Sequence, residues 1–363
     1  MIYIAYFILL FTLIQVIVAL TNLLFETNLP ESNDTSEELV SVLIPARNEE
    51  DNIGNIISDL INQDYRNIEV IVFNDQSDDR TAEIATEYTI RDKRIQLVNS
   101  DGLPDGWLGK NFACHSLSKY SKGKYLLFLD ADVRIGDNVI EKAVTFSENH
   151  NLGLISIFPK QIIRSFGEMI TVPNMNYILV SLLPLVLVRK SKFPSLAAAN
   201  GQFMFFKADI YRSMWPHEKM RSDKVEDISI SRTYKEKGIK VACLLGDNAI
   251  SCRMYSGFRE SVNGFSKNVV AFFGNSFILA SLFWLVTTFG FLFILFELTV
   301  ELFVTYLIAF LSARIIISIV SRQNIFYNLL FIIPLQLSSG LFIYKAFINK
   351  YFKKFQWKGR SID

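Results

Sequence analysis

The chain has 363 residues, half of them hydrophobic, and a formal net charge of only +1. So small a net charge provides no field that attracts nucleic acid, although residues 350–360 are locally rich in lysine and arginine. Cys114, Cys243 and Cys252 show no C-x-x-C spacing, so they are interpreted as reduced thiols facing the cytoplasm, not as a disulfide framework. The three histidines are too scattered to indicate a zinc site.

The first apolar segment covers residues 2–24 and is long enough to span a bilayer. The alternative, a signal peptide, is disfavoured because the segment lacks a basic leading region and a small-residue cleavage site. We therefore predict an N-terminal transmembrane anchor at residues 1–25, followed by a polar, acidic linker at residues 26–38.

From residue 39 onward, short apolar runs alternate with stretches of helical period, such as Ile53, Ile57 and Leu60. This alternation predicts an α/β domain over residues 39–268, with a parallel sheet that is covered on both faces. Ligands bind such sheets at the carboxyl ends of the strands. The predicted strands are 40–44, 68–73, 95–98 and 125–129, and the predicted helices between them include 51–61 and 81–88.

The chain becomes apolar again over residues 269–347, which we predict to form transmembrane helices near 270–296, 299–320 and 325–346. A basic cytoplasmic tail, residues 348–363, is expected to follow.

The charges around these helices give conflicting topologies. The positive-inside rule places both the turn between Arg314 and Arg322 and the basic tail in the cytoplasm, but one full span between them would separate the two. We therefore expect Pro334 and Gln336 to break segment 325–346 into a re-entrant or interfacial element. Segment 166–188 is apolar but interrupted, and is expected to lie in the membrane interface beside the active site.

Asp130 and Asp132 follow the predicted buried strand 125–129 and are the most informative residues of the chain. Residues two apart on an extended backbone point to the same side, so both carboxylates can meet one ion just past the strand end. Such oxygen pairs suit Mg²⁺ or Mn²⁺, and that ion neutralises phosphate oxygens. Taken alone, however, two acidic residues at a strand end also make an ordinary turn.

Further polar motifs follow other predicted strands, and together they resemble a known family. The ordered runs SVLIPARNEE, VIVFNDQSDDRT, LLFLDADV and VEDISISRTYKEKGIKV, within residues 39–260, resemble family 2 of the inverting glycosyltransferases. The resemblance implies the GT-A nucleotide-diphospho-sugar transferase fold. The runs GWLGKNFA at 106–113 and WKGR at 357–360 resemble its membrane-bound branch of diaponeurosporenoate and hopanoid-associated glycosyltransferases.

On the donor side, the resemblance assigns Asp75 to the uracil ring of a UDP-sugar and Glu49 to the nucleoside. Asp75 has the alternative of an Asx turn, and Glu49 that of an ordinary helix-start acid. Asp132 is the expected metal ligand, and Asp130 lies near the metal or the ribose. Lys110, and less so Arg47, is expected to contact the diphosphate; each has the alternative of an ordinary exposed cation.

On the acceptor side, Asp227 is the predicted general base, since inverting transfer needs one carboxylate to take the proton of the attacking hydroxyl. Glu226 beside it is a predicted substrate-binding residue that raises the proton affinity of the base by like charge. A solvated acidic pair at a helix start is the alternative. Asn200 and Gly201 resemble the acceptor-side loop, which a plain turn would also explain.

The chain lacks the Q-x-x-R-W element of the processive members after the base, and reads RMYSGFRE at 253–260 instead. Its predicted function is therefore transfer of a single sugar, with a divalent metal, from a nucleotide-diphospho-sugar to a lipid acceptor such as a carotenoid acid, hopanoid or polyprenyl phosphate. The expected location is the plasma membrane, multi-pass, with a cytoplasmic catalytic domain.

Two alternatives to the enzyme were weighed. An inactive membrane scaffold of the same fold, serving polysaccharide assembly, is disfavoured by the intact acidic motifs. A dinucleotide-dependent oxidoreductase is disfavoured because PARN stands at 45–48, where that fold carries G-x-G-x-x-G.

Overall fold

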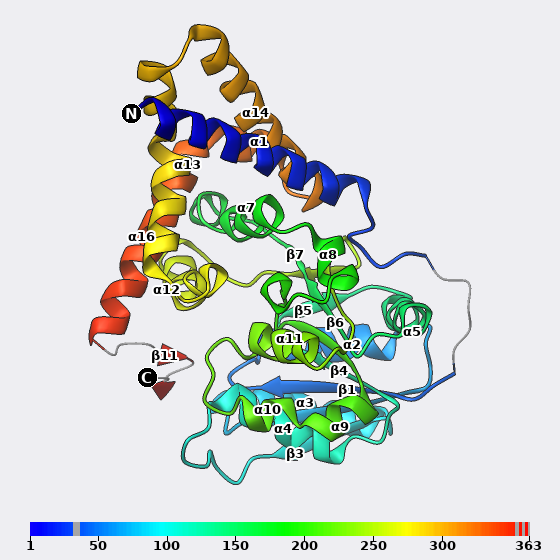
Figure 1. Cartoon of the computed structure of the whole chain (residues 1–363). Coiled ribbons are helices and arrows are strands. Elements are labelled where there is room, and N and C mark those ends of the chain that lie inside the picture. Colours follow the sequence, from blue (N-terminus) through cyan, green and yellow to red (C-terminus); the bar gives the residue numbers. More distant parts are fainter. Residues whose placement is uncertain (32–36, 353–355, 358–359, 362–363) are drawn as a thin grey trace. The chain divides into compact units, whose positions relative to one another are not determined.

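The computed structural model describes residues 1–31, 37–352, 356–357 and 360–361. They form two compact units, each built from separate stretches of chain (Figure 1). Much of the predicted tail, 348–363, and part of the predicted linker lie outside the described residues. The α/β unit comprises 28–160 and 185–252, and the helical unit comprises 1–27, 161–184 and 253–363.

A seven-stranded sheet forms the centre of the α/β unit, in the order β3-β2-β1-β4-β8-β6-β9. β3, β2, β1 and β4 run parallel, as the sequence predicts. β8, which the sequence analysis did not predict as a strand, runs antiparallel to both of its neighbours, β4 and β6, so the complete sheet is mixed. The strands are β1 Val40–Ala46, β2 Ile68–Asn74, β3 Ile95–Asn99, β4 Tyr125–Leu129, β6 Leu154–Phe158, β8 Phe203–Lys207 and β9 Val241–Leu245.

The reversed direction of β8 has a local consequence for the site. Phe203, its first residue, pairs with Leu129, the last residue of β4. The loop that leads into β8 therefore lies at the edge where the parallel strands end. Asp130 donates its backbone N–H to the carbonyl of Gln202 at 3.1 Å, which joins the acidic motif after β4 to that loop.

Amphipathic helices pack on this sheet. Helix α2, Ile53–Ile61, buries Ile53, Ile56, Ile57 and Leu60 on one stripe, as its period predicts. A small second sheet has the order β5-β10-β7. The remaining elements are α3 Thr81–Arg91, α4 Gly109–Tyr120, α5 Val139–His150, α8 Leu185–Lys190, α9 Ala208–Met214, α10 Pro216–Lys219, α11 Glu226–Glu236, β5 Val133–Ile135, β7 Lys160–Gln161 and β10 Ile250–Cys252.

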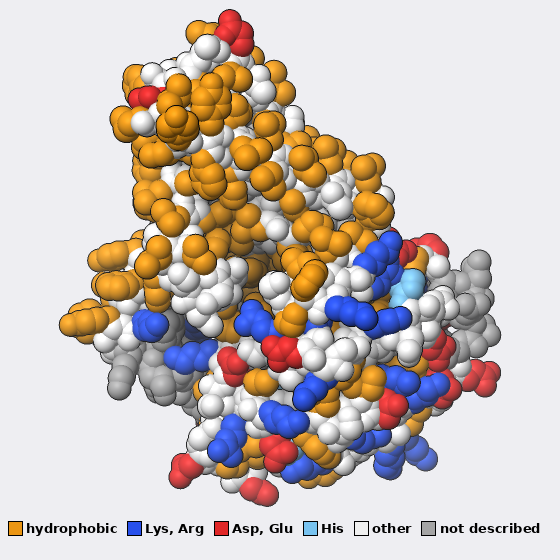
Figure 2. All heavy atoms as spheres, viewed as in Figure 1, with side chains coloured by type: hydrophobic (Ala, Val, Ile, Leu, Met, Phe, Trp, Pro, Cys, Tyr) orange, Lys and Arg blue, Asp and Glu red, His pale blue; other side chains and the backbone are white. Residues whose placement is uncertain are grey.

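The helical unit contains the three described helices that are long and apolar enough to cross a membrane: α1 Ile2–Leu24, α13 Phe277–Glu297 and α14 Val300–Val320. These helices support membrane association. Ala5 and Ile8 of α1 share a core with Ile294 of α13 and Tyr306 of α14. Figure 2 shows hydrophobic side chains covering the outside of these helices. The other helices are α6 Phe166–Met169, α7 Pro173–Leu182, α12 Phe258–Asn268, α15 Ile325–Leu330 and α16 Ile332–Phe352.

Segment 325–346 is interrupted, but at Phe331, which ends α15 with non-helical dihedral angles, and not at Pro334 or Gln336 as the sequence suggested. Pro334 lies in the first turn of α16. The first backbone N–H groups of a helix have no intrahelical partner, so a proline there removes no hydrogen bond. α16 carries Lys345 and Lys350 and is not among the three candidate spans.

Hydrogen bonds between side chains and backbone link the helices of this unit. The Asn22 amide of α1 donates to the carbonyls of Val180 and Leu183 at 3.0 and 2.9 Å. The indole N–H of Trp284 on α13 donates to the carbonyl of Gln336 on α16 at 2.8 Å. Such contacts join helices where apolar burial alone gives little preference.

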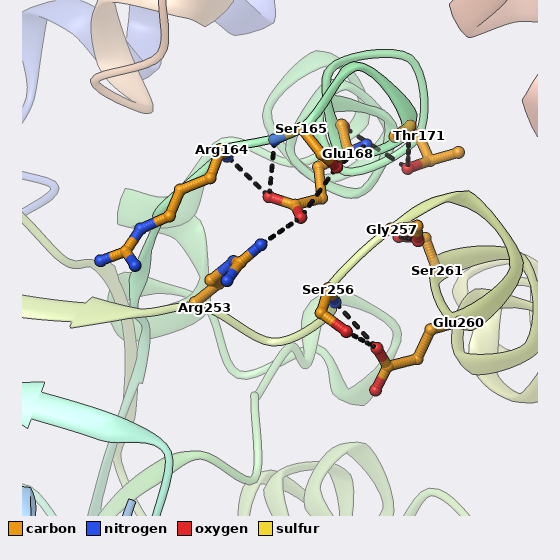
Figure 3. A network of polar contacts seen from close by, with 10 residues as sticks. Arg164, Ser165, Glu168, Thr171, Arg253, Ser256, Gly257, Glu260 and Ser261 are labelled. Atoms are coloured by element: carbon orange, nitrogen blue, oxygen red, sulfur yellow. Dashed lines mark hydrogen bonds and ion pairs between the residues drawn. The ribbon is translucent and has the colours of Figure 1, made fainter. Parts of the chain in front are cut away.

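Glu168 of α6 joins two stretches of the helical unit that are distant in sequence (Figure 3). Its carboxylate is fully buried. It accepts from the backbone N–H of Arg164 at 2.6 Å and from the guanidinium of Arg253 at 2.8 Å. Ser165 completes a capping box at the start of α6. Glu168 therefore connects the segment that follows β7 to the segment that follows β10.

Candidate active site

The candidate site forms at the carboxyl edge of the parallel strands. β1 lies between β2 and β4, so Asp75, which follows β2, and Asp130, which follows β4, lie at the same edge on either side of β1. Ligands bind open α/β sheets at this edge. The Asp75 side chain is almost fully buried.

Hydrogen bonds join the loop that follows β1 to the loop that follows β2. The Arg47 guanidinium donates to the carbonyls of Asp75 and Gln76 at 2.6 and 3.1 Å. The backbone N–H of Glu49 donates to the hydroxyl of Thr81 at 2.7 Å. Arg47, a predicted diphosphate contact, thus holds the loop that carries Asp75.

Lys110, in the first turn of α4, forms an ion pair with Asp130 at 2.7 Å. Its ammonium also donates to the carbonyl of Gly201 at 3.2 Å. Burial disfavours the charge of Lys110, but the carboxylates of Asp130 and Glu226 raise its pKa well above the ordinary value. Lys110 is therefore a fixed cation between the acidic motif and the loop before β8.

Gly201 is the meeting point of the acceptor-side residues. Its backbone N–H donates to Asp227 Oδ2 at 2.9 Å. A Cβ at Gly201 would lie only 3.0 Å from the Lys110 ammonium, 3.3 Å from Glu226 Oε1 and 3.7 Å from Asp227 Oδ2. These charged groups approach the backbone closely because position 201 has no side chain.

The carboxyl groups of Glu226 and Asp227 both bind protons more tightly than usual. Burial raises the pKa of Glu226 to about 8, with Lys110 opposing and Asp227 adding to the shift. Burial likewise raises the pKa of Asp227, although hydrogen bonds from Ile228 and Gly201 oppose that shift. A carboxylate with a raised pKa is a better proton acceptor at neutral pH.

Asp132 has the features of a metal ligand. Its Oδ1 is buried and has no hydrogen-bond partner. Burial, followed by the charges of Asp130 and Glu49, raises its pKa to about 7, while the thiol of Cys252 opposes the shift. An unpaired carboxylate oxygen beside further negative charge fits a hard divalent cation.

The protein supplies only part of such a coordination shell. Among the described residues, no group of three or more His, Cys, Asp or Glu side chains is placed to hold a metal ion. The donor set at Asp130 and Asp132 therefore fits a cation that takes its remaining ligands from substrate phosphates and water, as Mg²⁺ and Mn²⁺ commonly do.

Two nearby residues with structural roles were not singled out from the sequence. The Asn111 amide, buried on α4, donates to the carbonyls of Met220 and Asp223 at 2.7 and 3.0 Å and so fixes the loop that leads into α11. Cys252 accepts a hydrogen bond from the Gln202 amide at 3.0 Å. The available signal for Asn111 was its position directly after Lys110.

The structure thus brings Lys110, Asp130, Gly201, Glu226 and Asp227 into one cluster, with Asp132 and Glu49 coupled to it by charge. Asn200 precedes Gly201, and its backbone exchanges hydrogen bonds with the Ser156 hydroxyl at 2.7 and 3.0 Å. Asp75 lies at the same edge, across β1.

The chain is similar to known glycosyltransferases. Residues 41–215 match the sequence profile of Glycosyl transferase family 2. Over these residues the chain is similar to the family 2 glycosyltransferases. The 4,4'-diaponeurosporenoate glycosyltransferase of Staphylococcus haemolyticus is 28% identical over 241 residues, which cover 63% of this chain and 60% of that protein. The protein of the same name from Staphylococcus aureus strain USA300 is 27% identical over 246 residues, covering 64% and 61%.

These alignments span about 60% of the length of the relatives. Among solved structures, the mannosyltransferase PcManGT from Pyrobaculum calidifontis, in complex with GDP-Man and Mn²⁺, has a TM-score of 0.58 and 16% identity, over 96% of this chain and 99% of its own. The family 2 domain of this chain accordingly has the GT-A fold.

Proposed function

We propose that the protein is an inverting, membrane-embedded glycosyltransferase. It moves a single sugar from a nucleotide-diphospho-sugar to a lipid or other hydrophobic acceptor, with a carotenoid acid, a hopanoid or a polyprenyl phosphate as candidates. The family 2 domain supports sugar transfer. The observation that carries the proposal is the convergence of Lys110, Asp130 and Asp227 around Gly201, although they are far apart in the chain.

For the donor, we assign Asp75 and Glu49 to the nucleoside. Lys110 is assigned to the diphosphate, because its ammonium is already fixed at the edge of the sheet beside Asp130. Asp130 and Asp132 would hold Mg²⁺ or Mn²⁺. When bound, that ion stabilises the charge that develops on the leaving diphosphate. The Mn²⁺ in the PcManGT complex supports this assignment.

For the transfer, we assign Asp227 as the general base. Where the acceptor group is a hydroxyl, Asp227 accepts its proton while the oxygen attacks the anomeric carbon in line with the leaving diphosphate, which inverts the configuration. A carboxylate or phosphate acceptor is already ionised and attacks in the same geometry without giving up a proton. The hydrogen bond from Gly201 at 2.9 Å fixes one carboxylate oxygen. Glu226, whose pKa burial raises to about 8, is assigned to substrate binding beside the base.

For the acceptor, we assign the Asn200–Gly201 loop to the sugar-accepting group. The names of the curated relatives and the three apolar helices support a hydrophobic acceptor. The missing Q-x-x-R-W element supports one transfer per acceptor. We further propose a multi-pass position in the plasma membrane, with the 39–268 domain on the cytoplasmic side.

The test uses the full chain, purified in a mild detergent with Mn²⁺ or Mg²⁺, lipid extract and a panel of UDP- and GDP-sugars. We expect release of nucleoside diphosphate with one donor, and mass spectrometry to find one lipid heavier by a single sugar. Heat-inactivated protein serves as the background. No release above that background with any donor and metal would refute the proposal and favour an inactive scaffold.

A further inference from the structure

Arg314 is a buried cation inside the helical unit and far from the charges of the candidate active site in sequence. It lies on α14, one of the three candidate membrane spans, and is only 4% exposed. Among the described residues it forms no ion pair. The acid nearest to it along the helix, Glu301, precedes it by 13 residues, which is about 20 Å of helix.

The immediate neighbours of Arg314 supply polar and aromatic contact but no negative charge. Its guanidinium carbon lies 3.6 Å from the ring centroid of Tyr177 on α7. The Gln15 amide of α1 contacts the Tyr177 hydroxyl at 3.4 Å and donates to the Ser181 hydroxyl at 3.2 Å. Residues of α1, α7 and α14 thus form a polar layer between apolar helices.

Two atoms of Arg314 lack a partner in this layer. Nε and Nη2 are both buried and make no hydrogen bond. They share one edge of the planar guanidinium, the edge whose two parallel N–H groups match the two oxygens of a carboxylate or phosphate. An unpaired buried charge costs several kcal/mol, and ionisable residues inside membrane spans are commonly functional. An anion would satisfy both N–H groups and the charge together.

A second unpaired donor lies toward the end of α14. The Asn328 amide donates to Ser318 Oγ at 2.9 Å and to Gln323 Oε1 at 2.8 Å, while Gln323 Nε2 is buried without a partner. Ser318 is one turn beyond Arg314 and donates to its carbonyl at 2.8 Å. From Arg314 to the end of the helix at Val320 is about 9 Å. An amphiphile whose headgroup sits at this depth keeps its tail in the apolar layer.

We propose that Arg314 anchors the acidic headgroup, a carboxylate or a phosphate, of a membrane amphiphile bound by the helical unit. The Nε–Nη2 edge pairs with two headgroup oxygens, and Tyr177 holds the guanidinium plane in place. The proposal is independent of the sugar-transfer proposal, because it concerns residues of the helical unit alone and holds whatever the α/β unit binds.

The test measures thermal unfolding of the full chain in a neutral detergent by tryptophan fluorescence. Two matched pairs of probes differ only in the acidic group: oleate against oleyl alcohol, and dioleoyl phosphatidic acid against dioleoylglycerol. Acetate and inorganic phosphate test soluble anions. We expect at least one acidic amphiphile to raise the Tm by roughly 4 °C, and the neutral and soluble probes to leave it unchanged.

Three variants locate the effect. Arg314→Met keeps the length of the side chain and removes the charge, so the Tm without amphiphile should stay the same or rise, while the response to the amphiphile disappears. Arg314→Lys keeps the charge without the paired N–H groups, and should retain a smaller response; it carries the test if Arg314→Met does not fold. Arg322→Gln removes an exposed arginine just after α14 and should respond like the wild type.

Four results would overturn the proposal. They are an equal response of wild type and Arg314→Met or Arg314→Lys, an equal response to acidic and neutral probes, loss of the response in Arg322→Gln, and no wild-type response to either acidic amphiphile. Stabilisation of the wild type by phosphate or acetate alone would identify the ligand as a soluble anion and refute a membrane source.

Discussion

In the α/β unit the central strands bury aliphatic and aromatic side chains, such as Leu127 and Phe205, and the charged groups gather at one edge of the sheet. In the helical unit large apolar side chains face outward, whereas Gln15, Asn22 and Asn174 are buried between helices. Figure 2 shows this apolar exterior. The two units are therefore stabilised by different forces. Burial of apolar surface stabilises a unit in water, whereas helices surrounded by hydrocarbon gain little from it and associate through close packing and hydrogen bonds.

The atoms that pack against glycines also differ between the two units. A Cβ on Gly290 of α13 would lie 2.8 Å from Ile8 of α1, and one on Gly340 of α16 would lie 2.4 Å from the Trp284 ring. These residues let helix backbones approach closely, which is how helices associate in membranes. Gly201 also allows a close approach in the α/β unit, but there the approaching groups are ionisable side chains, the nearest of them the Lys110 ammonium at 3.0 Å.

The largest effect in the α/β unit is expected from removing the carboxylate of Asp227 at the edge of the sheet. Asp227→Asn removes the proposed base and should lower transfer by about 100- to 10,000-fold, with little change in donor binding or Tm. The measurement is product formation together with donor titration. Turnover within a few-fold of the wild type would remove Asp227 from the role of base.

Asp132→Asn tests the metal assignment. Because it removes one of the two proposed ligating carboxylates, metal-dependent binding of the nucleotide donor should weaken by roughly 10- to 100-fold. Calorimetric titration with and without Mn²⁺ measures the effect. Asp137→Asn, at an exposed acid a few residues further on, is the matched control. Wild-type affinity in Asp132→Asn with metal present would disprove the assignment.

Gly340→Ala tests whether close backbone approach stabilises the helical unit. The new methyl group overlaps the Trp284 indole, so the variant should lose about 1–3 kcal/mol of stability. Gly54→Ala is its counterpart in α2 of the α/β unit, where the Cβ would lie 3.4 Å from Ile84, an ordinary contact. That variant should gain up to about 1 kcal/mol. Equal effects of the two changes on Tm would contradict the contrast drawn between the units.

A smaller effect is expected from pH. Glu226 has its pKa raised from 4.5 to about 8 in the folded protein, so between these values the folded state holds a proton that the unfolded chain has lost. Stability should therefore fall as the pH rises from about 5 to 8. Tm measured across this range should vary less in Glu226→Gln than in wild type. The exposed Glu87→Gln should keep the wild-type slope.

The sequence predicts those parts of the fold and site that depend on local pattern. The five apolar residues of β4 followed by Asp130 and Asp132 are an example, because strand, strand end and paired carboxylates are all visible within eight positions. The candidate spans α1, α13 and α14 are equally visible, because length and apolarity suffice to find them.

The remainder depends on contacts between distant residues. The reversed direction of β8 follows from its pairing with β4 and β6, which no local run encodes. Gln15 and Asn22 look like isolated polar residues in an apolar run until α7 is placed beside them. The hydrogen bonds from the Arg47 guanidinium to backbone carbonyls of the neighbouring loop are likewise invisible in the sequence.

The interleaved order of the two units limits how the protein can be dissected. The polypeptide passes from one unit to the other after residues 27, 160, 184 and 252. Trimming both ends to 28–252 would keep α6 and α7 but remove the helices on which they pack, and so expose their apolar faces to water. A water-soluble enzyme fragment would instead require excising 161–184 and joining its flanks with a designed bridge.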